Sequence, residues 1–285
     1  MPDKEDFDTD EILKRKYDRS VERLDRKSDR DRIRDKEDDG LKLVDTVFDN
    51  KTRLILFSMI TKGFFDEISG AISTGKEANV YYAPIKDTGI VVKIFRIDAP
   101  SFRNMRPYME GDHRFRSVKS SRAGFIEAWA KKEFKNLKRL EEHGIPAPKP
   151  IYSERNIVLM EFLGADDAVF PRLKDTKPVN PGNLYERLIR TVKDIYRKAM
   201  LVHADLSEFN ILYHEKEDQF YIIDVGQGVL WDHPRAQEFL LRDLNNLNRY
   251  FGNLGVNIIE LPKVYKWVTG DPVNDALLYS LEFDS

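Results

Sequence analysis

The sequence predicts an α+β fold with two lobes, a small N-terminal lobe rich in β-strands and a mostly helical C-terminal lobe. Two observations support this: strand-like segments gather before residue 162, and helix-like periodicity dominates the last third of the chain. The chain has 285 residues, enough for one sizeable domain or for two small lobes that share a cleft. We expect an N-terminal arm over 1–40, an N-lobe over 41–162 and a C-lobe over 163–285.

Composition narrows the class of protein further. Hydrophobic residues make up 41% and the net charge is −2, so a packed core is expected and no global field favours a polyanion. There is no cysteine, which excludes disulfides and thiolate-rich zinc sites. Without a membrane-length apolar run or an apolar signal core, we expect a cytoplasmic protein that has no membrane partner.

The N-terminal arm and the N-lobe differ sharply in character. Residues 1–40 hold 15 acidic and 12 basic side chains, which predicts a disordered arm or a frayed helix. In the N-lobe we expect a helix near 54–60, a phosphate-binding segment, strands at 80–82 and 90–95, a flexible loop, and a helix over 125–142. The flexible loop covers 98–122 and lacks periodicity.

The C-lobe is predicted to begin after a short buried strand at 157–162. Residues 164–181 resemble a linker, and 183–202 have the apolar spacing of a helix that opens at Asn183. Two short strands are expected near 211–213 and 221–223, followed by helices.

The segment His203–Asn210, HADLSEFN, carries the strongest chemical signal. It has the His-x-Asp spacing with an Asn five residues after the Asp, which is typical of a kinase catalytic loop. Asp205 could orient and deprotonate an attacking hydroxyl, while Asn210 could reach a metal held on phosphates. Taken alone, the same residues could form a solvated turn with an N-capping Asp.

Two further positions strengthen that interpretation. Asp224 ends the apolar strand Tyr221–Ile223, where a kinase places a metal-binding Asp. Lys93 interrupts an apolar strand, and a buried lysine is costly unless it is paired or used. Its expected partner is Glu133, with Glu127 as the second choice. The alternatives are an ordinary turn Asp and an edge-strand lysine that reaches water.

The segment Ser73–Ala78 lies before the first strand pair and could bind phosphates through its small hydroxyl side chains and backbone amides. It contains Gly75 but lacks the other glycines of the kinase glycine-rich loop, and it is not a Walker A loop.

Three segments together, STGKEANVY, HADLSEFN and IIDVGQGV, resemble the RIO family of atypical serine kinases, above all its first, STGKEA-type subfamily. The similarity covers roughly residues 50–255 and implies a two-lobed protein-kinase-like fold that uses ATP and Mg²⁺, with Mn²⁺ as a substitute. It implies Asp205 as the base, Asn210 and Asp224 as metal ligands, and a role in maturing the small ribosomal subunit. The residues expected at ATP are Ser73, Thr74, Gly75, Lys76, Glu77, Ala78, Val80, Lys93, Glu133, Met160, Glu161 and Leu163.

The sequence also departs from ordinary protein kinases, because no Ala-Pro-Glu follows Asp224. We therefore expect neither an activation loop nor the peptide-binding subdomains. Asp224 itself is a candidate acceptor of a transient phosphoryl group, which would give ATPase activity. The alternatives are a small-molecule phosphotransferase of the aminoglycoside or choline kinase type and a catalytically inactive kinase-like binding module.

The loop 98–122 combines basic and aromatic side chains, a composition that can hold RNA by phosphate contacts and stacking. The pre-ribosomal small subunit, through protein or rRNA, is the partner that the family resemblance implies. A solvated mobile loop explains the composition equally well. The basic and aromatic residues are Arg103, Arg106, Arg114, Arg116, Lys119, Arg122, Phe102, Tyr108 and Phe115, and the candidate autophosphorylation sites are Ser101, Ser117, Ser120 and Ser121.

Overall fold

The computed structural model describes residues 48–86, 88–99, 102–115, 121–165, 168–274 and 276–278. The chain divides into two compact units, Met1–Phe64 and Phe65–Ser285. The predicted arm over 1–40 lies outside the described residues. The predicted division between lobes at 162 falls inside the second unit and stays a prediction.

The described part of the first unit is the helix α3, Asn50–Thr61. It begins at the N-cap Asp49, whose carboxylate accepts hydrogen bonds from the backbone N–H groups of Lys51 and Thr52. This helix extends the one expected near 54–60 by several residues at its N-terminal end.

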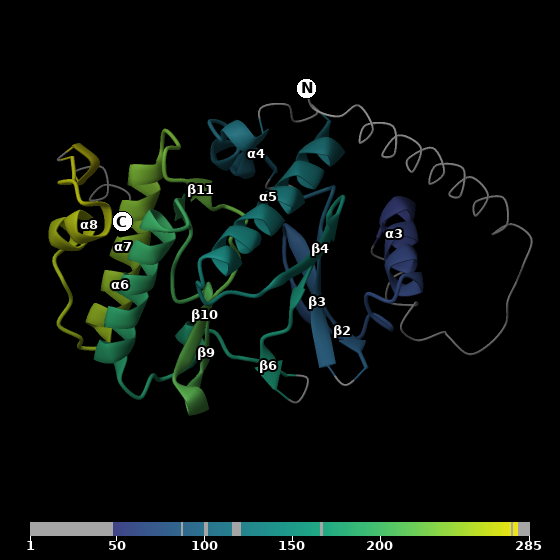
Figure 1. Cartoon of the computed structure of the whole chain (residues 1–285), viewed down its shortest axis with the longest axis horizontal. Helices are drawn as coiled ribbons and strands as arrows, with labels where there is room; N and C mark the ends of the chain where they lie inside the picture. Colours follow the sequence, from purple (N-terminus) through teal and green to yellow (C-terminus); the bar gives the residue numbers. More distant parts are fainter. Residues whose placement is uncertain are drawn as a thin grey trace, which may run out of the picture. The chain divides into compact units, whose positions relative to one another are not determined.

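A five-stranded antiparallel sheet forms the N-terminal part of the second unit (Figure 1). Its spatial order is β1-β2-β3-β5-β4, and β3 is central, paired with β2 on one side and β5 on the other. Lys93 lies on β3 between Val80 and Val158 of the neighbouring strands. The strands are β1 Ala71–Thr74, β2 Ala78–Ile85, β3 Thr88–Phe95, β4 Pro150–Glu154 and β5 Ile157–Glu161.

The long helix α5, Arg122–Glu142, packs along this sheet against β4 and β5. It begins three residues earlier than predicted because the Ser121 hydroxyl caps it by accepting a hydrogen bond from the N–H of Gly124. Trp129, Leu137 and Leu140 are buried on one face, as their helical spacing predicts.

The segment between β3 and α5 differs from the expectation of a loop without regular structure. It contains the short helix α4, Phe102–Met105, and 3₁₀ turns at Arg106–Tyr108 and His113–Phe115. Met105 and Met109 are buried, so tertiary packing rather than local periodicity orders this segment. The described residues 102–115 therefore contain short helical turns, and the flexibility expected of 98–122 stays a prediction.

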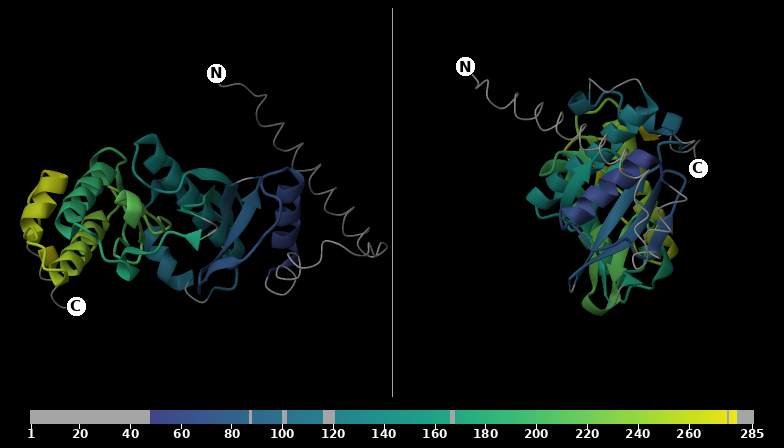
Figure 2. Two further views of the ribbon diagram at one scale, coloured as in Figure 1. Left: turned by 90° about the horizontal axis from the view of Figure 1, so that it is seen from below. Right: turned by 90° about the vertical axis from the view of Figure 1, so that its right-hand side faces the viewer.

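Three helices dominate the C-terminal part, and Figure 2 shows them grouped at the end of the second unit away from the sheet. α6 packs on α7 and α8. Their bounds are α6 Pro181–Arg197, α7 Ala236–Asn253 and α8 Leu261–Thr269. The predicted helix 183–202 is shorter at its C-terminal end, because residues 201 and 202 pair with β11 instead. Asn180, not Asn183, caps the start of α6.

Short antiparallel ladders lie between the sheet and the helices in Figure 1 and hold the loops that carry the polar motifs. β9 pairs with β10, close to the predicted strands at 211–213 and 221–223. The other pairs, β6 with β7 and β8 with β11, are two residues long and were not predicted. The strands are β6 Gly164–Ala165, β7 Ala168–Val169, β8 Leu201–Val202, β9 Ile211–His214, β10 Gln219–Ile222 and β11 Val229–Leu230. Further 3₁₀ turns lie at Leu173–Asp175 and Glu215–Glu217.

An apolar core runs through the second unit from Val91 on β3, through Trp129 on α5, to Leu244 on α7 and Val264 on α8. It fixes the sheet and the helices to each other and so positions the loops between them. Among the described residues, no helix is both long and apolar enough to cross a bilayer.

Candidate active site

The polar motifs meet in a cleft of about 280 Å³ in the second unit. Eight of the residues expected at ATP line it: Ser73, Gly75, Lys76, Glu77, Ala78, Val80, Lys93 and Glu133. Asp205 and Asp224 line it as well. The structure therefore brings the phosphate loop, the strand lysine and two motif carboxylates to one place.

Lys93 connects two carboxylates at the centre of the cleft. Its Nζ lies 2.7 Å from Glu133 Oε1 and 2.6 Å from Asp224 Oδ1. Glu127, the second choice for this partner, instead forms an ion pair with Arg155 at 2.9 Å. Both carboxylates line the cleft, but the side chain of Glu133 is 2% exposed and that of Asp224 is 45% exposed, so Asp224 is the more open of the two.

The pKa values follow from this arrangement. Burial alone would lower the pKa of Lys93, but the charges of Asp224 and Glu133 outweigh it and the pKa is raised. The Lys93 ammonium lowers the pKa of Asp224, whereas burial raises the pKa of Glu133 against the pull of the same ammonium. Lys93 and Asp224 are consequently charged at neutral pH.

Two side-chain amide groups bind the same oxygen of Asp205. Asn210 Nδ2 donates to the Asp205 carbonyl at 2.7 Å and to Oδ2 at 3.1 Å, and Gln227 Nε2 also donates to Oδ2 at 3.1 Å. Burial raises the pKa of Asp205, opposed by the charge of Arg242 and the Asn210 hydrogen bond. A carboxylate with a raised pKa is a stronger base, as proton abstraction from a hydroxyl requires.

His203 joins the Asp205 loop to the strand that carries Asp224. Its Nδ1 accepts a hydrogen bond from the N–H of Asp205 at 3.3 Å, so the proton lies on Nε2, which donates to the carbonyl of Ile223 at 2.9 Å. Burial lowers the pKa of His203 to about 4. The neutral imidazole is therefore a structural tie between the two motif loops.

The same loop is anchored from α7 by side chains that the sequence analysis missed. Asp243 accepts hydrogen bonds from the N–H groups of Ala204 and Leu206, each at 2.8 Å, and Arg242 donates to the Ala204 carbonyl. Ala204 has a left-handed backbone with φ of 67°, which costs a non-glycine residue about 1 kcal/mol or more. The bonds to Asp243 offset that strain. No local pattern marks Asp243, because its role depends on a contact 37 to 39 residues away.

Other predicted positions lie elsewhere. Thr74, Met160, Glu161 and Leu163 do not line the cleft, although Met160 and Glu161 end β5 and Leu163 follows it. Ser121 caps α5, while Ser101, Ser117 and Ser120 lie outside the described residues. The cleft also contains residues that were not predicted: Phe95, Trp129, Arg172, Gly226 and Gln227.

The donor set suits a magnesium ion only in company with phosphates. The described residues contain no cluster of three or more His, Cys, Asp or Glu that could hold a metal. Asp224 supplies a half-exposed carboxylate in the cleft, whereas Asn210 donates its amide nitrogen to Asp205 and is not among the residues that line the cleft. Mg²⁺ is commonly bound by one or two carboxylates together with substrate phosphates, and the Asp224 carboxylate fits that pattern.

The cleft and its fold define a phosphotransferase of the protein-kinase-like class. A sequence model of the RIO domain matches residues 79–264. The chain is 40% identical over 259 residues to the RIO-type serine/threonine-protein kinase Rio1 of Haloferax volcanii, covering 90% of this chain and 88% of the relative. It is 39% identical over 269 residues to the serine/threonine-protein kinase RIO1 of Homo sapiens, covering 93% of this chain and 46% of that one.

A solved structure, the Rio2 kinase of Chaetomium thermophilum in an ADP/Mg²⁺-phosphoaspartate complex, matches with a TM-score of 0.59 and 27% identity, covering 81% of this chain and 71% of that one. The chain belongs to the RIO family of serine/threonine protein kinases, and its two-lobed kinase-like fold agrees with the sequence prediction. It spans about half the length of the human, Caenorhabditis elegans and Dictyostelium discoideum relatives.

Proposed function

We propose that this chain transfers the γ-phosphoryl group of ATP, with Mg²⁺, to a serine or threonine hydroxyl. The observation that carries the proposal is the meeting of Lys93, Asp205 and Asp224 in one cleft beside the STGKEA loop. Lys93, Lys76 and Arg172 supply positive charge for the phosphates on the cleft wall. The ion would add charge neutralisation between the phosphates, held by Asn210 and Asp224.

Asp205 is the proposed base. Its carboxylate takes the proton of the acceptor hydroxyl while that oxygen bonds to the γ-phosphorus, and the bond to the β–γ bridging oxygen breaks to release ADP. Gln227 and Asn210 orient this carboxylate by donating to Oδ2. Adenine is expected at the exit from β5, near Glu161 and Leu163. The Leu163 carbonyl there accepts a hydrogen bond from the backbone N–H of Phe170, with an N–O distance of 2.9 Å.

A second candidate reaction is hydrolysis of ATP through a phosphoryl group on Asp224. The half-exposed Asp224 carboxylate lies in the cleft, and the similar Rio2 kinase of Chaetomium thermophilum was solved as a phosphoaspartate complex. Carboxylate attack on the γ-phosphorus would release ADP and form an acyl phosphate, which water then hydrolyses to phosphate and the free carboxylate. Departure of Lys93 from Asp224 towards the nucleotide phosphates would free the oxygen for this attack.

One experiment separates the two reactions. The protein is incubated with Mg²⁺ and γ-labelled ATP, and the labelled protein is treated with hydroxylamine, which cleaves acyl phosphates and spares phosphoserine. Hydroxylamine-labile label that is absent from Asp224→Asn supports the aspartyl intermediate. Stable label located on Ser or Thr supports kinase chemistry alone, and the lack of both label and released phosphate contradicts the proposed function.

The partner follows from the family resemblance and is part of the same proposal. We propose that the acceptor lies on the pre-ribosomal small subunit and that the enzyme acts in the cytoplasm. Sedimentation of the chain with small-subunit precursor particles tests this. Two of the residues expected to contact RNA also make contacts inside the protein: Arg114 is paired with Asp112, and Tyr108 stacks on Phe239.

A further inference from the structure

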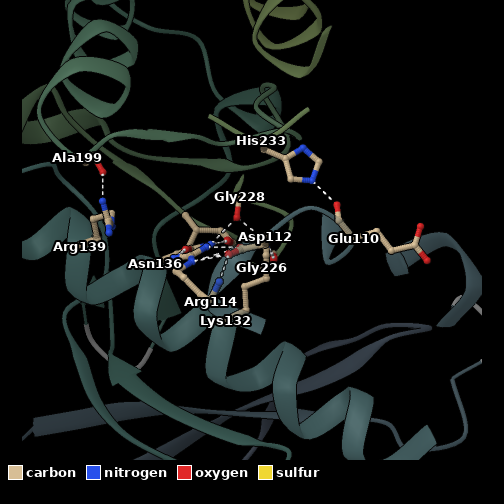
Figure 3. A network of polar contacts seen from close by, with 11 residues as sticks. Glu110, Asp112, Arg114, Lys132, Asn136, Arg139, Ala199, Gly226, Gly228 and His233 are labelled. Atoms are coloured by element: carbon tan, nitrogen blue, oxygen red, sulfur yellow. Dashed lines mark hydrogen bonds and ion pairs between the residues drawn. The ribbon is translucent and has the colours of Figure 1, made fainter. Parts of the chain in front are cut away.

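Arg114 occupies a polar site that is almost closed to solvent. Its side chain is 10% exposed and that of its partner Asp112 is fully buried. Two guanidinium nitrogens bind the two Asp112 oxygens, with an Nη2–Oδ2 distance of 2.7 Å, and the remaining Nη1 donates to Asn136 Oδ1 at 2.9 Å. Figure 3 shows this group gathered against α5. A three-way arrangement of this kind directs the guanidinium towards one neighbour, Asn136.

Asn136 and Lys132, one helical turn apart on α5, bind the backbone that directly follows Asp224. Asn136 Nδ2 donates to the carbonyls of Val225 and Gly228, each at 2.8 Å, and Lys132 Nζ donates to the carbonyls of Gly226, at 2.9 Å, and Gly228. Lys132 and Asn136 are both completely buried. Three carbonyls within a four-residue stretch are therefore held by two side chains of one helix (Figure 3).

The backbone at Gly228 lies so close to Asn136 that a side chain there would require its neighbours to shift. A Cβ at Gly228 would lie 3.0 Å from Asn136 Nδ2 and 3.0 Å from the Val225 carbonyl oxygen. Asp224 itself has a left-handed backbone with φ of 59°, so its carboxylate direction depends on how the next residues are held. The contacts from α5 fix that backbone in place.

A second connection runs from the same segment, residues 105–115, to the Asp205 loop. Tyr108 stacks on Phe239 of α7 with ring centroids 5.0 Å apart. Its hydroxyl lies 3.4 Å from Arg242 Nη2, the group that also donates to the Ala204 carbonyl. Residues 105–115 thus contact the supports of both motif carboxylates.

We infer that Arg114 and Asn136 are positioning residues for phosphoryl transfer, and that residues 105–115 hold the Asp224 loop in its working geometry through them. The inference rests on the proposed role of Asp224. Arg114 holds the oxygen of Asn136, so that the Asn136 nitrogen faces the carbonyls of residues 225 and 228. Weakening these contacts leaves the ATP-binding strands unchanged, but the Asp224 carboxylate is no longer held in one orientation.

Two variants test the inference with intact protein. Arg114→Met combined with Asp112→Asn removes the buried charges as a pair, which avoids leaving Asp112 unpaired. Asn136→Asp keeps the acceptor for Arg114 but places an oxygen opposite the two carbonyls. In both, we expect kcat to fall by about tenfold with little change in KM for ATP, as is usual when a residue behind a metal ligand is lost. In nucleotide-free protein, amide exchange of residues 224–230 should accelerate by at least about tenfold while that of α7 stays constant.

Arg139→Met is the matched control. Arg139 also lies on α5 and also donates to a backbone carbonyl, that of Ala199 at 3.0 Å, but it makes no contact with the 225–228 backbone (Figure 3). It should keep wild-type kcat and wild-type exchange at 224–230, and Arg114→Lys should recover part of both.

Unchanged exchange at 224–230 in both test variants would overturn the inference, as would faster exchange with unchanged kcat. Equal acceleration in α7 and in 224–230 would reduce the network to a general stabilising role and overturn it too. If the wild-type protein shows no turnover at all, the proposed function fails, and the exchange data alone decide whether residues 105–115 hold the loop.

Discussion

Replacing Lys93 with Met gives the most direct test of the electrostatics at the centre of the cleft. The change removes the ammonium that lies 2.7 Å from Glu133 and 2.6 Å from Asp224. Glu133 then remains with a 2% exposed side chain and no cation, and its Oε2 already lacks a hydrogen-bond partner among the described residues. Removing one partner of a buried ion pair costs about 3–5 kcal/mol.

We expect the lower end of that range, about 3 kcal/mol, for two reasons. Asp224 is half exposed and keeps its hydration, so only Glu133 becomes a buried carboxylate without a cation beside it. Glu133 can also take up a proton, because burial already raises its pKa and loss of Lys93 raises that pKa further. The measurement is urea unfolding followed by circular dichroism at pH 7.5, with an m-value that matches the wild type.

The pH dependence has a defined sign. In the variant, folded Glu133 binds a proton at a higher pH than unfolded Glu133, so the folded state holds more protons in the interval between the two pKa values. Stability contributed by this group is therefore greatest at low pH and is lost as pH rises through the folded pKa. The variant should recover stability relative to the wild type when the pH is lowered from 7.5 towards 5.

Glu133→Gln provides the control, because it keeps the shape of the side chain and removes its charge. The double variant, Lys93→Met with Glu133→Gln, should be more stable than the sum of the single effects predicts, by at least about 1 kcal/mol. Additive effects, or a loss below about 1 kcal/mol in Lys93→Met, would show that Glu133 is not stabilised by the ammonium.

Three further outcomes are expected. Asp205→Asn should lower phosphate release by at least about a hundredfold while nucleotide binding, measured by calorimetry, is kept, and near-normal release would rule out its role as base. ATP with Mg²⁺ should raise the melting temperature of the wild type, and Asn210→Ala combined with Asp224→Ala should reduce the Mg²⁺-dependent part of that rise; an undiminished part would contradict their placement as metal ligands. His203, with a folded pKa of about 4 against the usual 6.5, should contribute about 3 kcal/mol of stability above pH 6.5 that is lost as pH falls towards 4. In His203→Gln, the loss of stability between pH 6.5 and pH 4 should be smaller than in the wild type, and an identical dependence of stability on pH would refute this role of His203.

The sequence by itself predicted that Lys93, Asp205 and Asp224 belong to one site, and they line one cleft, because their motifs depend on short-range geometry. The spacing from Asp205 to Asn210 is a property of one tight loop, and the structure closes it with hydrogen bonds of 2.7 and 3.1 Å. Strand alternation around Lys93 predicts its place on a strand, and the apolar run before Asp224 predicts its place just after one. The main helices α5 and α6 follow from apolar periodicity, with errors only at their ends.

Only the tertiary structure decided which side chains support those positions. Arg114 looked like a surface charge in a loop, yet it is buried, because Asp112 and Asn136 compensate it after α5 packs beside the segment. Asp243 reaches back 37 to 39 residues to the Asp205 loop, and Lys132 reaches forward 94 residues to Gly226. Such contacts produce no periodic pattern in the sequence. The cost of burying a charge is compensated by partners that are distant in sequence and that only the fold brings together.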